Sequence, residues 1–445
     1  MAEIRPFRAL HYNPEKISDL SKVITQPYDK ISPEMQSRYY SLSPYNLVRI
    51  IRGKETPQDS AVENVYTRAL RDFKDWIQNR ILISDERPAL YPYSQEYALP
   101  GEPGVRKERR GFIALCRLED YSARIVHRHE ETLSGPKADR MELLKRTKAH
   151  FGQVFFLYSD PEGVVEGALS AASRGAVWEQ LMDEYQTRHM VWRVSDPAAI
   201  ERVVQGMRDK KLVIADGHHR YETALAYRNL MRAKPNYDQR AEYVMATFVR
   251  METDGLTILP THRVIHSLKS FAWAQFAEAA RTAFDWKELD ASRALADGGK
   301  GLRQALGEGG HSRPTLAVYA GAGKLVLLGL RQDYDLAHAL PDLSPLQRRL
   351  DVVILHRLLI ERALGISSEA VREEKNIRYL RGLSNAVEEV DSGRAQLCFL
   401  MNPTPIEAVR EVALAGEVMP QKSTDFYPKL LSGLTIYWLE NPLGI

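Results

Sequence analysis

Apolar residues in the first half of the chain follow the spacing of short helices and strands. They recur every three or four positions from Val62 to Trp76, which predicts an amphipathic helix. The runs ALYPYSQEYAL and RRGFIALCRL predict two strands that form a hairpin around the loop Pro100–Gly104. The basic segment RKERR beside this hairpin is expected on a solvated surface, because a glutamate interrupts it on a turn.

The middle of the chain alternates between strand and helix patterns. HMVWRVSD predicts a strand, and Asp196 followed by Pro197 predicts a capped helix start. KLVIAD then predicts an apolar strand that ends at Gly217, and a second helix is expected to begin near Tyr221. This order is typical of an α/β arrangement. The strand-like KVIT near the N-terminus fits the same picture.

The second half has its own series of elements. A glycine-rich stretch at about residues 290–325 predicts loops or a lobe boundary. Beyond it, the pattern predicts helices over Pro345–Leu364 and Pro405–Ala415, a buried strand at AQLCFLM and a closing strand at SGLTIYWLE. We therefore predict mixed α/β sheets in two lobes, residues 1–265 and 266–445.

Composition narrows the classes of protein that the chain can represent. It has 445 residues, of which 44% are hydrophobic and 27% charged, as in ordinary globular proteins. A net charge of +3 argues against nucleic acid as a partner. Cys116 and Cys398 stand alone in apolar runs and are expected to be buried thiols in a reducing compartment. The N-terminus shows no apolar h-region, and no apolar run is long enough to span a bilayer, so we expect a cytoplasmic protein without a membrane partner. We expect it to be a monomer or a homodimer.

The densest group of reactive side chains is ADGHHRY, at the junction of the KLVIAD strand and the following helix. Ligands bind at such strand ends because the next helix presents unpaired N–H groups to anions. Asp216 supplies a carboxylate, Gly217 a tight turn, and His218 and His219 titratable donors. The guanidinium of Arg220 fits phosphate. The segment therefore predicts an anion-binding site.

Four other polar segments could complete this site. The candidate residues are Tyr28, Asp29, Asn46 and Arg49; His129, Glu130, Lys137 and Arg140; His262 and Arg263; and Lys422, Ser423, Thr424 and Lys429. Together they offer the cations, hydroxyls and histidines that phosphoryl transfer uses. We expect the loop Lys422–Lys429 to fold back onto the pocket at Asp216.

The sequence favours magnesium over zinc as the metal. Adjacent histidines such as His218 and His219 rarely bind one ion, and a further Cys or His at ligand spacing is missing from the sequence. Magnesium needs a carboxylate or two and arrives with phosphate, so Asp29 or Glu130 could hold it. The sequence also lacks a Walker A loop, a GxGxxG motif and a GxSxG elbow.

The segment ADGHHRY resembles the GHHR-type signature of the ParB/sulfiredoxin-like superfamily, whose members bind nucleotide or polyphosphate at this loop and helix. Nearly the whole chain resembles a long bacterial and archaeal family of unknown function, through IRPFRAL, QPYDKIS, HRHEETLSGPKADRMELL, IADGHHRYETALAY, LPTHRVI and MPQKSTDFYPKLLSGL. One position departs from the PPYD expected of the family, since this chain reads QPYD from Gln26 to Asp29.

The resemblance extends to free-serine kinases of the same superfamily, which make O-phospho-L-serine with pyrophosphate, ADP or ATP. It implies a ParB/sulfiredoxin-like core and a magnesium-dependent phosphotransferase that acts on free L-serine, with Asp216–Arg220 in the donor site. For the base that takes the serine proton, Asp216 is the first candidate, Asp29 the second and Glu130 the reserve. A ParB-like, nucleotide-dependent DNA-binding protein and a sulfiredoxin-like redox enzyme are the alternatives.

Overall fold

The computed structural model describes residues 1–131 and 135–444, and the chain folds into two compact units. Unit 1 comprises Met1–Arg128, Thr132–Thr257 and Pro428–Ile445, and unit 2 comprises His129–Glu131 and Ile258–Tyr427. These bounds differ from the expected division into residues 1–265 and 266–445. Strand β14 (His262–Ile265) pairs with strands of unit 2, and the C-terminal segment returns to unit 1.

Unit 1 is built on a large mixed sheet. Its strands are β1 (Ile4–Arg5), β4 (Tyr91–Leu99), β5 (Glu102–Arg117), β6 (Val126–His127), β8 (Val154–Tyr158), β9 (Glu179–Met182), β10 (Arg188–Val191), β11 (Leu212–Asp216) and β12 (Tyr243–Arg250). The strand order is β6-β11-β8-β12-β5-β4-β10-β9, and β1 pairs with β5. Strand β8 runs parallel to β12 and antiparallel to β11, so the sheet mixes both directions.

The core of unit 1 lies where helices cover the central strands. Strands β8 and β12 are apolar along almost their whole length because both of their faces are buried. Phe248 stacks on Phe112 and on Phe156, with ring centroids 5.0 Å and 5.6 Å apart. Helices α5 (Val164–Ala172), α6 (Pro197–Met207) and α7 (His218–Arg232) add residues to the same cluster. This packing fixes the end of β11, where the candidate site begins.

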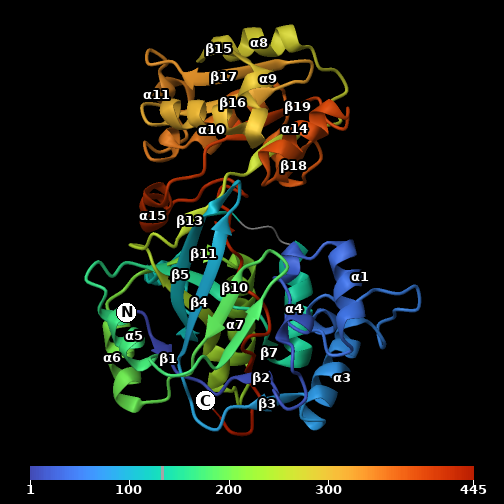
Figure 1. Cartoon of the computed structure of the whole chain (residues 1–445), viewed down its shortest axis with the longest axis vertical. Coiled ribbons are helices and arrows are strands. Elements are labelled where there is room, and N and C mark those ends of the chain that lie inside the picture. The colour runs from blue at the N-terminus through green and yellow to red at the C-terminus, as the bar shows by residue number, and fades with distance from the viewer. Residues whose placement is uncertain (132–134, 445) are drawn as a thin grey trace. The chain divides into compact units, whose positions relative to one another are not determined.

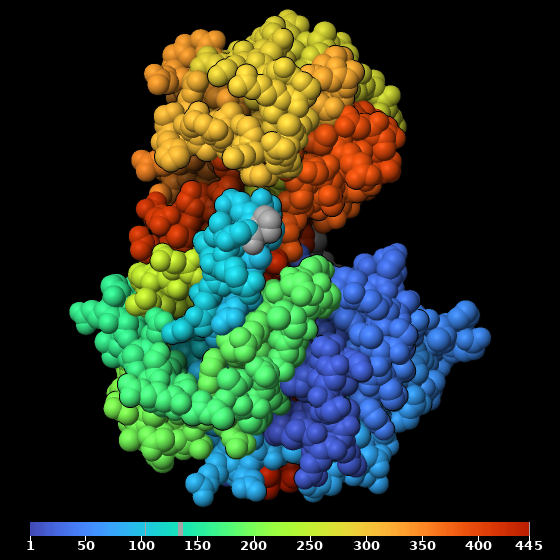
Figure 2. All heavy atoms as spheres, in the orientation of Figure 1, coloured from blue at the N-terminus to red at the C-terminus, as the bar shows by residue number. Residues whose placement is uncertain are grey.

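A second group of helices belongs to the same unit. It consists of α1 (Pro33–Leu42), α2 (Val48–Ile51), α3 (Val65–Gln78) and α4 (Gly135–Thr147). In Figure 1, α1, α3 and α4 lie on the opposite side of unit 1 from α5 and α6. Figure 2 shows the β9–β10 hairpin, in green, beside the dark blue N-terminal residues. Arg38 of α1 pairs with Glu184 of the β9–β10 turn at 3.0 Å.

Unit 2 has a separate sheet and core. Its main strands are β14, β15 (Phe284–Asp290), β16 (Thr315–Tyr319), β17 (Lys324–Leu330), β18 (Ile377–Leu380) and β19 (Leu397–Met401), in the order β15-β17-β16-β19-β14-β18. Its helices include α8 (Trp273–Arg281), α10 (Ala296–Gly310), α14 (Leu383–Asp391) and α15 (Ile406–Leu414). Side chains from α10, α14 and the central strands form one buried cluster. The α/β fold class predicted from the sequence is confirmed.

Several predicted elements are confirmed. The amphipathic helix is α3, which begins at Val65 because Asn64 caps it, so that Val62 lies outside. Strands β4 and β5 form the predicted antiparallel hairpin. Asp196 accepts a hydrogen bond from the Ala199 amide and caps α6.

Other expectations were wrong. The glycine-rich segment does not form loops but contains α10 and the β16–β17 hairpin, with left-handed residues Asp297–Gly299 at a kink in α10. Residues 345–364 form a short 3₁₀ turn, α12 (Asp351–Ile354) and a π-helical stretch (Leu355–Ala363) instead of one α-helix. The closing strand reduces to β21 (Tyr437–Trp438), and KVIT is not a strand. Apolar content alone does not distinguish these backbone forms.

Within the described residues, the structure has no helix long and apolar enough to cross a membrane. Cys116 and Cys398 are free and buried, as predicted. Burial raises the pKa of both thiols, which disfavours the thiolate that a redox enzyme would need.

Candidate active site

The candidate site is built on the turn between β11 and α7. Strand β11 ends at Asp216, and Gly217 adopts φ +89°, a left-handed conformation that glycine tolerates best. A Cβ atom at this position would lie 2.9 Å from Nε of Arg220. Helix α7 therefore begins at His218 and not near Tyr221, which places His218, His219 and Arg220 in its first turn.

Changing Gly217 to alanine is expected to weaken the binding of pyrophosphate, used as an anionic probe, by at least about 10-fold, because the new methyl group displaces the Arg220 guanidinium. Calorimetric titration with pyrophosphate measures the effect. Gly163→Ala is the matched control, since Gly163 is also a left-handed residue before a helix, with φ +66°. Equal losses in the two variants would show that backbone strain, and not Arg220, is responsible.

Three cations surround the Asp216 carboxylate. Arg220 Nη2 lies 3.3 Å and Lys429 Nζ 3.7 Å from Asp216 Oδ2. Burial acts to raise the pKa of Asp216, but Lys429, Arg220 and Lys30 together hold it well below its usual range. The Asp216 carboxylate thus lies among several cations at the N-terminus of α7, where the helix dipole adds to the positive potential.

Arg220 is fixed by the start of β8. Its Nη1 donates to the main-chain carbonyl of Gln153, and the Gln153 side chain accepts a hydrogen bond from Thr247 Oγ1 at 3.0 Å. The guanidinium is therefore oriented before any ligand binds, a property expected of a preorganised anion site.

Lys429 is held by two hydrogen bonds to its own segment. Gln95 Nε2 donates to the Lys429 carbonyl at 2.9 Å, and Arg109 donates to the Pro428 carbonyl. Arg109 Nε also donates to Gln95 Oε1 at 3.0 Å, and its guanidinium lies 4.8 Å from the Phe155 ring centroid. Burial lowers the pKa of Arg109 to about 10, while Tyr97, Tyr93 and Asp216 act to raise it. Arg109 therefore remains charged and positions the Lys429 segment.

We expect Arg109→Met to lower the free energy of unfolding by about 2–4 kcal/mol, because two buried acceptors lose their donor. Urea titration measures the change. Arg110→Met is the matched control, since Arg110 is an exposed neighbour that pairs with Glu108, and should change stability by less than about 1 kcal/mol. Similar effects of the two substitutions would contradict the buried role of Arg109.

The Tyr28-Asp29-Lys30 turn is the second wall of the site. Tyr28 lines a small cavity of about 70 Å³ together with Arg140, Arg220, Thr223 and Ser432. The Arg140 guanidinium lies 4.0 Å from the Tyr28 ring centroid. Burial raises the pKa of Tyr28 to about 12. Because Tyr28 lies beside Arg220 and the charge of Lys30 acts on Asp216, the turn brings Asp29 into the neighbourhood of α7.

Asp29 and Asp216 lie in opposite electrostatic settings. The Asp29 side chain is exposed and, among the described residues, accepts no hydrogen bond and forms no ion pair. Asp216 is already engaged by Arg220 and Lys429. Asp29 is thus the carboxylate of this site that is available to a ligand or to a magnesium ion.

A buried polar chain supports the Tyr28–Asp29 turn. Gln26 Nε2 donates to Asp183 Oδ2 at 3.2 Å, and the same carboxylate lies 3.2 Å from His189 Nε2. His189 Nδ1 is hydrogen-bonded to the Tyr93 hydroxyl at 2.6 Å. Burial lowers the pKa of His189, and Asp183 opposes this effect. Gln26, which stands where proline is expected from the family pattern PPYD, therefore links this loop to the β9–β10 turn through Asp183.

Three predicted residues of unit 1 have other partners. Asn46 is buried and bonds the Lys22 carbonyl and the Val48 amide, at 2.7 Å and 3.0 Å. Arg49 lies over the Tyr40 ring, and Lys137 pairs with Glu222 on α7. Asn46 and Arg49 therefore stabilise the α1–α2 region in this structure.

The remaining predicted residues belong to unit 2 and form a group there. His129 Nε2 is hydrogen-bonded to Thr424 Oγ1 at 2.8 Å, and the Lys422 amide donates to Glu130 Oε1 at 2.6 Å. Arg263 donates to the Lys422 carbonyl at 3.0 Å. The other members are His262, whose pKa burial lowers to about 4, and Ser423, whose hydroxyl donates to the Pro420 carbonyl. That this group joins the site at Asp216 stays a prediction.

Magnesium binding stays a prediction, with single carboxylates as the candidate ligands. In the described part of the chain, no cluster of three or more His, Cys, Asp or Glu side chains has the arrangement of a metal site. Magnesium commonly uses one or two carboxylates together with water and phosphate oxygens. Asp29 offers such a carboxylate in unit 1, and Glu130 is the corresponding candidate in unit 2.

The sequence did not single out several supporting residues. They are Lys30, Gln95, Arg109, Gln153 and Ser432. Arg109 lies in RKERR, and the expectation of a solvated segment was wrong for this residue, which is 1% exposed. Successive side chains of β5 point to opposite faces of the sheet, so Arg109 turns inward while Arg110 faces solvent. Treating RKERR as part of a strand could therefore have predicted a buried arginine.

The fold and the candidate site define a two-unit α/β protein with a cation-lined strand-to-helix turn. The family model described as "Protein of unknown function (DUF1015)" matches residues 4–353, and the chain belongs to this family. The predicted membership of a family of unknown function is confirmed. No curated protein sequence matches the chain.

The solved structures that match the chain are remote from it in sequence. A conserved hypothetical protein from Pyrococcus furiosus is 11% identical, with a TM-score of 0.37, and the match covers 74% of this chain and 96% of the Pyrococcus chain. A free serine kinase in complex with AMP is 12% identical, with a TM-score of 0.36 and coverages of 72% and 92%. C-terminally truncated SbnI from Staphylococcus aureus is 10% identical, with a TM-score of 0.34 and coverages of 74% and 89%.

Proposed function

We propose that this protein is a phosphotransferase that phosphorylates free L-serine to O-phospho-L-serine, with pyrophosphate as the preferred donor and ADP or ATP as the alternatives. The observation that carries the proposal is the placement of the Arg220 and Lys429 cations 3.3 Å and 3.7 Å from Asp216 Oδ2, at the N-terminus of α7. The resemblance of ADGHHRY to donor-site signatures supports the same assignment.

The donor phosphates would bind in front of α7. Arg220 and Lys429 are held in place by main-chain contacts of their own segments, so they present charge to the ligand without a large reorganisation. The first-turn amides of α7 and the side chains of His218 and His219 add donors on the same side of the turn. This arrangement suits the equatorial oxygens of a transferring phosphoryl group.

Asp29 is better suited than Asp216 to take the serine proton. A general base needs a carboxylate whose lone pairs reach the hydroxyl. The cations that hold the pKa of Asp216 low also make it a weak base, whereas Asp29 is exposed and has no protein partner among the described residues. We therefore assign the base to Asp29, in place of the metal-binding role considered above, and the organisation of the donor-binding cations to Asp216.

In the proposed step, the serine Oγ forms a bond to the terminal phosphorus of the donor as the bridging P–O bond breaks. The hydroxyl proton goes to Asp29, and the leaving group is phosphate from pyrophosphate, AMP from ADP or ADP from ATP. When bound, magnesium would neutralise charge on the donor oxygens. Lys429 and Arg220 stabilise the negative charge that moves to the leaving group.

The test is direct detection of phosphoserine. The full chain is incubated with L-serine and Mg²⁺ and with pyrophosphate, ADP or ATP in separate reactions, and phosphoserine is followed by ³¹P NMR. Formation of phosphoserine with one donor, and its loss in Arg220→Gln, supports the proposal. A folded protein that forms none with any donor, or that retains DNA in a nucleotide-dependent manner instead, contradicts it.

A further inference from the structure

Buried hydrogen bonds connect the two walls of the candidate site. The Tyr93 hydroxyl lies 2.6 Å from His189 Nδ1 and is also hydrogen-bonded to the main chain of Leu431. Leu431 follows Lys429 by two residues, so the segment that carries this lysine contacts the buried side chains that support the Asp29 turn. All of these residues belong to unit 1.

Four side chains form this connection, which we call the His189 network. They are Tyr93, His189, Asp183 and Gln26, and their exposed fractions are 3%, 0%, 7% and 3%. Asp183 Oδ2 lies 3.2 Å from His189 Nε2 and accepts a hydrogen bond from Gln26 Nε2, also at 3.2 Å. Because these groups are shielded from water, a lost hydrogen bond is costly, and the position of each side chain depends on its neighbours.

Strand register places His189 between the two walls. β10 pairs with β4 so that His189 lies opposite Gln95, whose side chain donates to the Lys429 carbonyl at 2.9 Å. Because Asp183 is an acceptor, Nε2 carries the proton of the neutral imidazole and Nδ1 accepts from the Tyr93 hydroxyl. One ring is thus bonded towards both walls of the site.

The turn that follows Gln26 has little freedom of its own. The Gln26 amide donates to the Tyr39 hydroxyl at 3.3 Å. Pro27 follows with φ −55°, and its carbonyl accepts a hydrogen bond from the Lys30 amide at 2.9 Å. A displacement of Gln26 therefore moves the whole turn, including Asp29.

We propose that His189 is a positioning residue, which holds the Asp29 turn in a fixed position relative to the Lys429 segment. The ring is fully buried and acts through Tyr93 and Asp183. Its importance for turnover rests on the proposed phosphotransferase activity, in which Asp29 takes the serine proton and Lys429 binds the donor. Such reactions depend steeply on placement, because a misplacement of about 1 Å can lower the rate by about 100-fold.

Amide hydrogen exchange of the full chain tests this connection without relying on activity. Tyr93→Phe and Gln26→Met each remove one hydrogen bond of the His189 network and nearly keep the size of the side chain. Both should raise the exchange rate of the Lys30 amide by at least about 10-fold. His189→Phe, which breaks the network at its centre, should do the same for the Lys30 and Leu431 amides.

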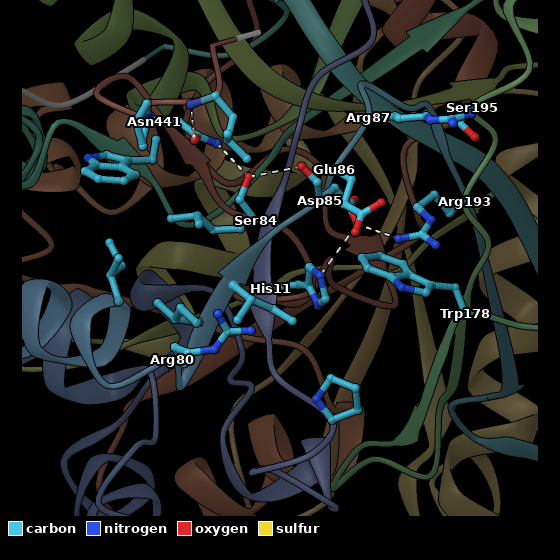
Figure 3. A pocket seen from close by; sticks show the side chains of 18 residues that line it. His11, Arg80, Ser84, Asp85, Glu86, Arg87, Trp178, Arg193, Ser195 and Asn441 are labelled. Carbon is cyan, nitrogen blue, oxygen red and sulfur yellow. Dashed lines mark hydrogen bonds and ion pairs between the residues drawn. The ribbon is translucent and has the colours of Figure 1, made fainter.

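Tyr91→Phe is the matched control for the loss of a buried hydroxyl from β4. The Tyr91 hydroxyl donates to Asp85 at 2.5 Å. Figure 3 shows Asp85 joined to His11 and Arg193 at the wall of a cavity that shares no residue with the candidate site. This cluster has the same types of side chain as the His189 network, so Tyr91→Phe should leave the exchange rate of the Lys30 amide within about twofold of the parent.

Kinetics with pyrophosphate and L-serine separate positioning from general stability. Tyr93→Phe and Gln26→Met should each lower kcat by at least about 10-fold. Calorimetry should find pyrophosphate affinity within about threefold of the parent, because Gln95 and Arg109 still hold the Lys429 segment. The double variant should lose no more than about twofold beyond the more affected single variant, because both substitutions break the same network.

Unchanged exchange of the Lys30 amide in Tyr93→Phe, or an equal rise in Tyr91→Phe, would overturn the proposal. So would kcat losses that multiply in the double variant, or a loss of pyrophosphate affinity as large as the loss of kcat. Absence of phosphoserine with every donor would instead reject the phosphotransferase activity, and the exchange rates would still decide whether His189 connects the two walls.

Discussion

Replacing Lys429 with methionine should lower kcat/KM for the phosphoryl donor by more than about 100-fold. The Lys429 side chain is only 8% exposed, and its Nζ lies 3.7 Å from Asp216 Oδ2. Methionine retains most of the apolar stem and its packing, so the main change is the loss of one charge from the donor site. Steady-state kinetics with pyrophosphate, together with calorimetric titration of pyrophosphate, measures this effect.

Lys145→Met is a suitable control for the general loss of a lysine. Lys145 is a surface residue of α4 that pairs with Glu142, and its removal should leave donor affinity within about twofold of the parent. If Lys429→Met binds pyrophosphate with unchanged affinity, the donor site is not at Asp216. A loss confined to turnover, with normal binding, would likewise contradict the ground-state contact proposed for Lys429.

Asp29→Asn should lower kcat by about 100-fold or more, the usual contribution of a general base, while pyrophosphate affinity changes by less than about twofold. Asparagine keeps the size and exposure of Asp29 but cannot accept the serine proton. Asp216→Asn should act differently, through donor affinity, because it removes the carboxylate that organises Lys429 and Arg220. Comparing kcat and KM for the donor in the two variants separates the roles.

The pH dependence of stability gives an independent check on Asp216. Its pKa is lowered in the folded state, so its contribution to stability is fully present above the unfolded value of about 4 and is lost as the pH falls through the lower folded value. The stability difference between the parent and Asp216→Asn should therefore be constant near neutral pH and shrink in acid.

If Asp216→Asn abolishes kcat with normal donor affinity and Asp29→Asn does not, the two carboxylates have exchanged roles.

The buried chain from Gln26 to Tyr93 explains how a loop near the N-terminus becomes part of the site. Gln26 is 3% exposed, and its side chain bonds Asp183 in the β9–β10 turn. Asp183 in turn accepts hydrogen bonds from the Tyr185 and Thr187 amides, each at 2.9 Å. The loop that carries Tyr28 and Asp29 is thus fixed to the sheet by side chains that do not themselves contact the proposed substrates.

The sequence by itself determined the features that depend on local chemistry. Apolar residues at helical spacing located α3, strand-like apolar runs located the β4–β5 hairpin and β11, and the Asp196–Pro197 pair located the start of α6. The ADGHHRY segment indicated the turn at Gly217. Its residues are adjacent in the chain, so their side chains lie near one another at the end of the strand whatever the rest of the fold is. The isolated settings of Cys116 and Cys398 were also sufficient to predict two buried thiols.

Only the tertiary structure decided which distant residues meet. Lys429 reaches Asp216 because Gln95 and Arg109 on neighbouring strands hold its backbone, and sequence spacing contains no information on that pairing. The same holds for the division of the chain, in which β14 joins unit 2 and Pro428–Ile445 returns to unit 1. Strand pairing and burial are set by contacts between segments far apart in the chain, so they follow from the packed fold and not from local pattern.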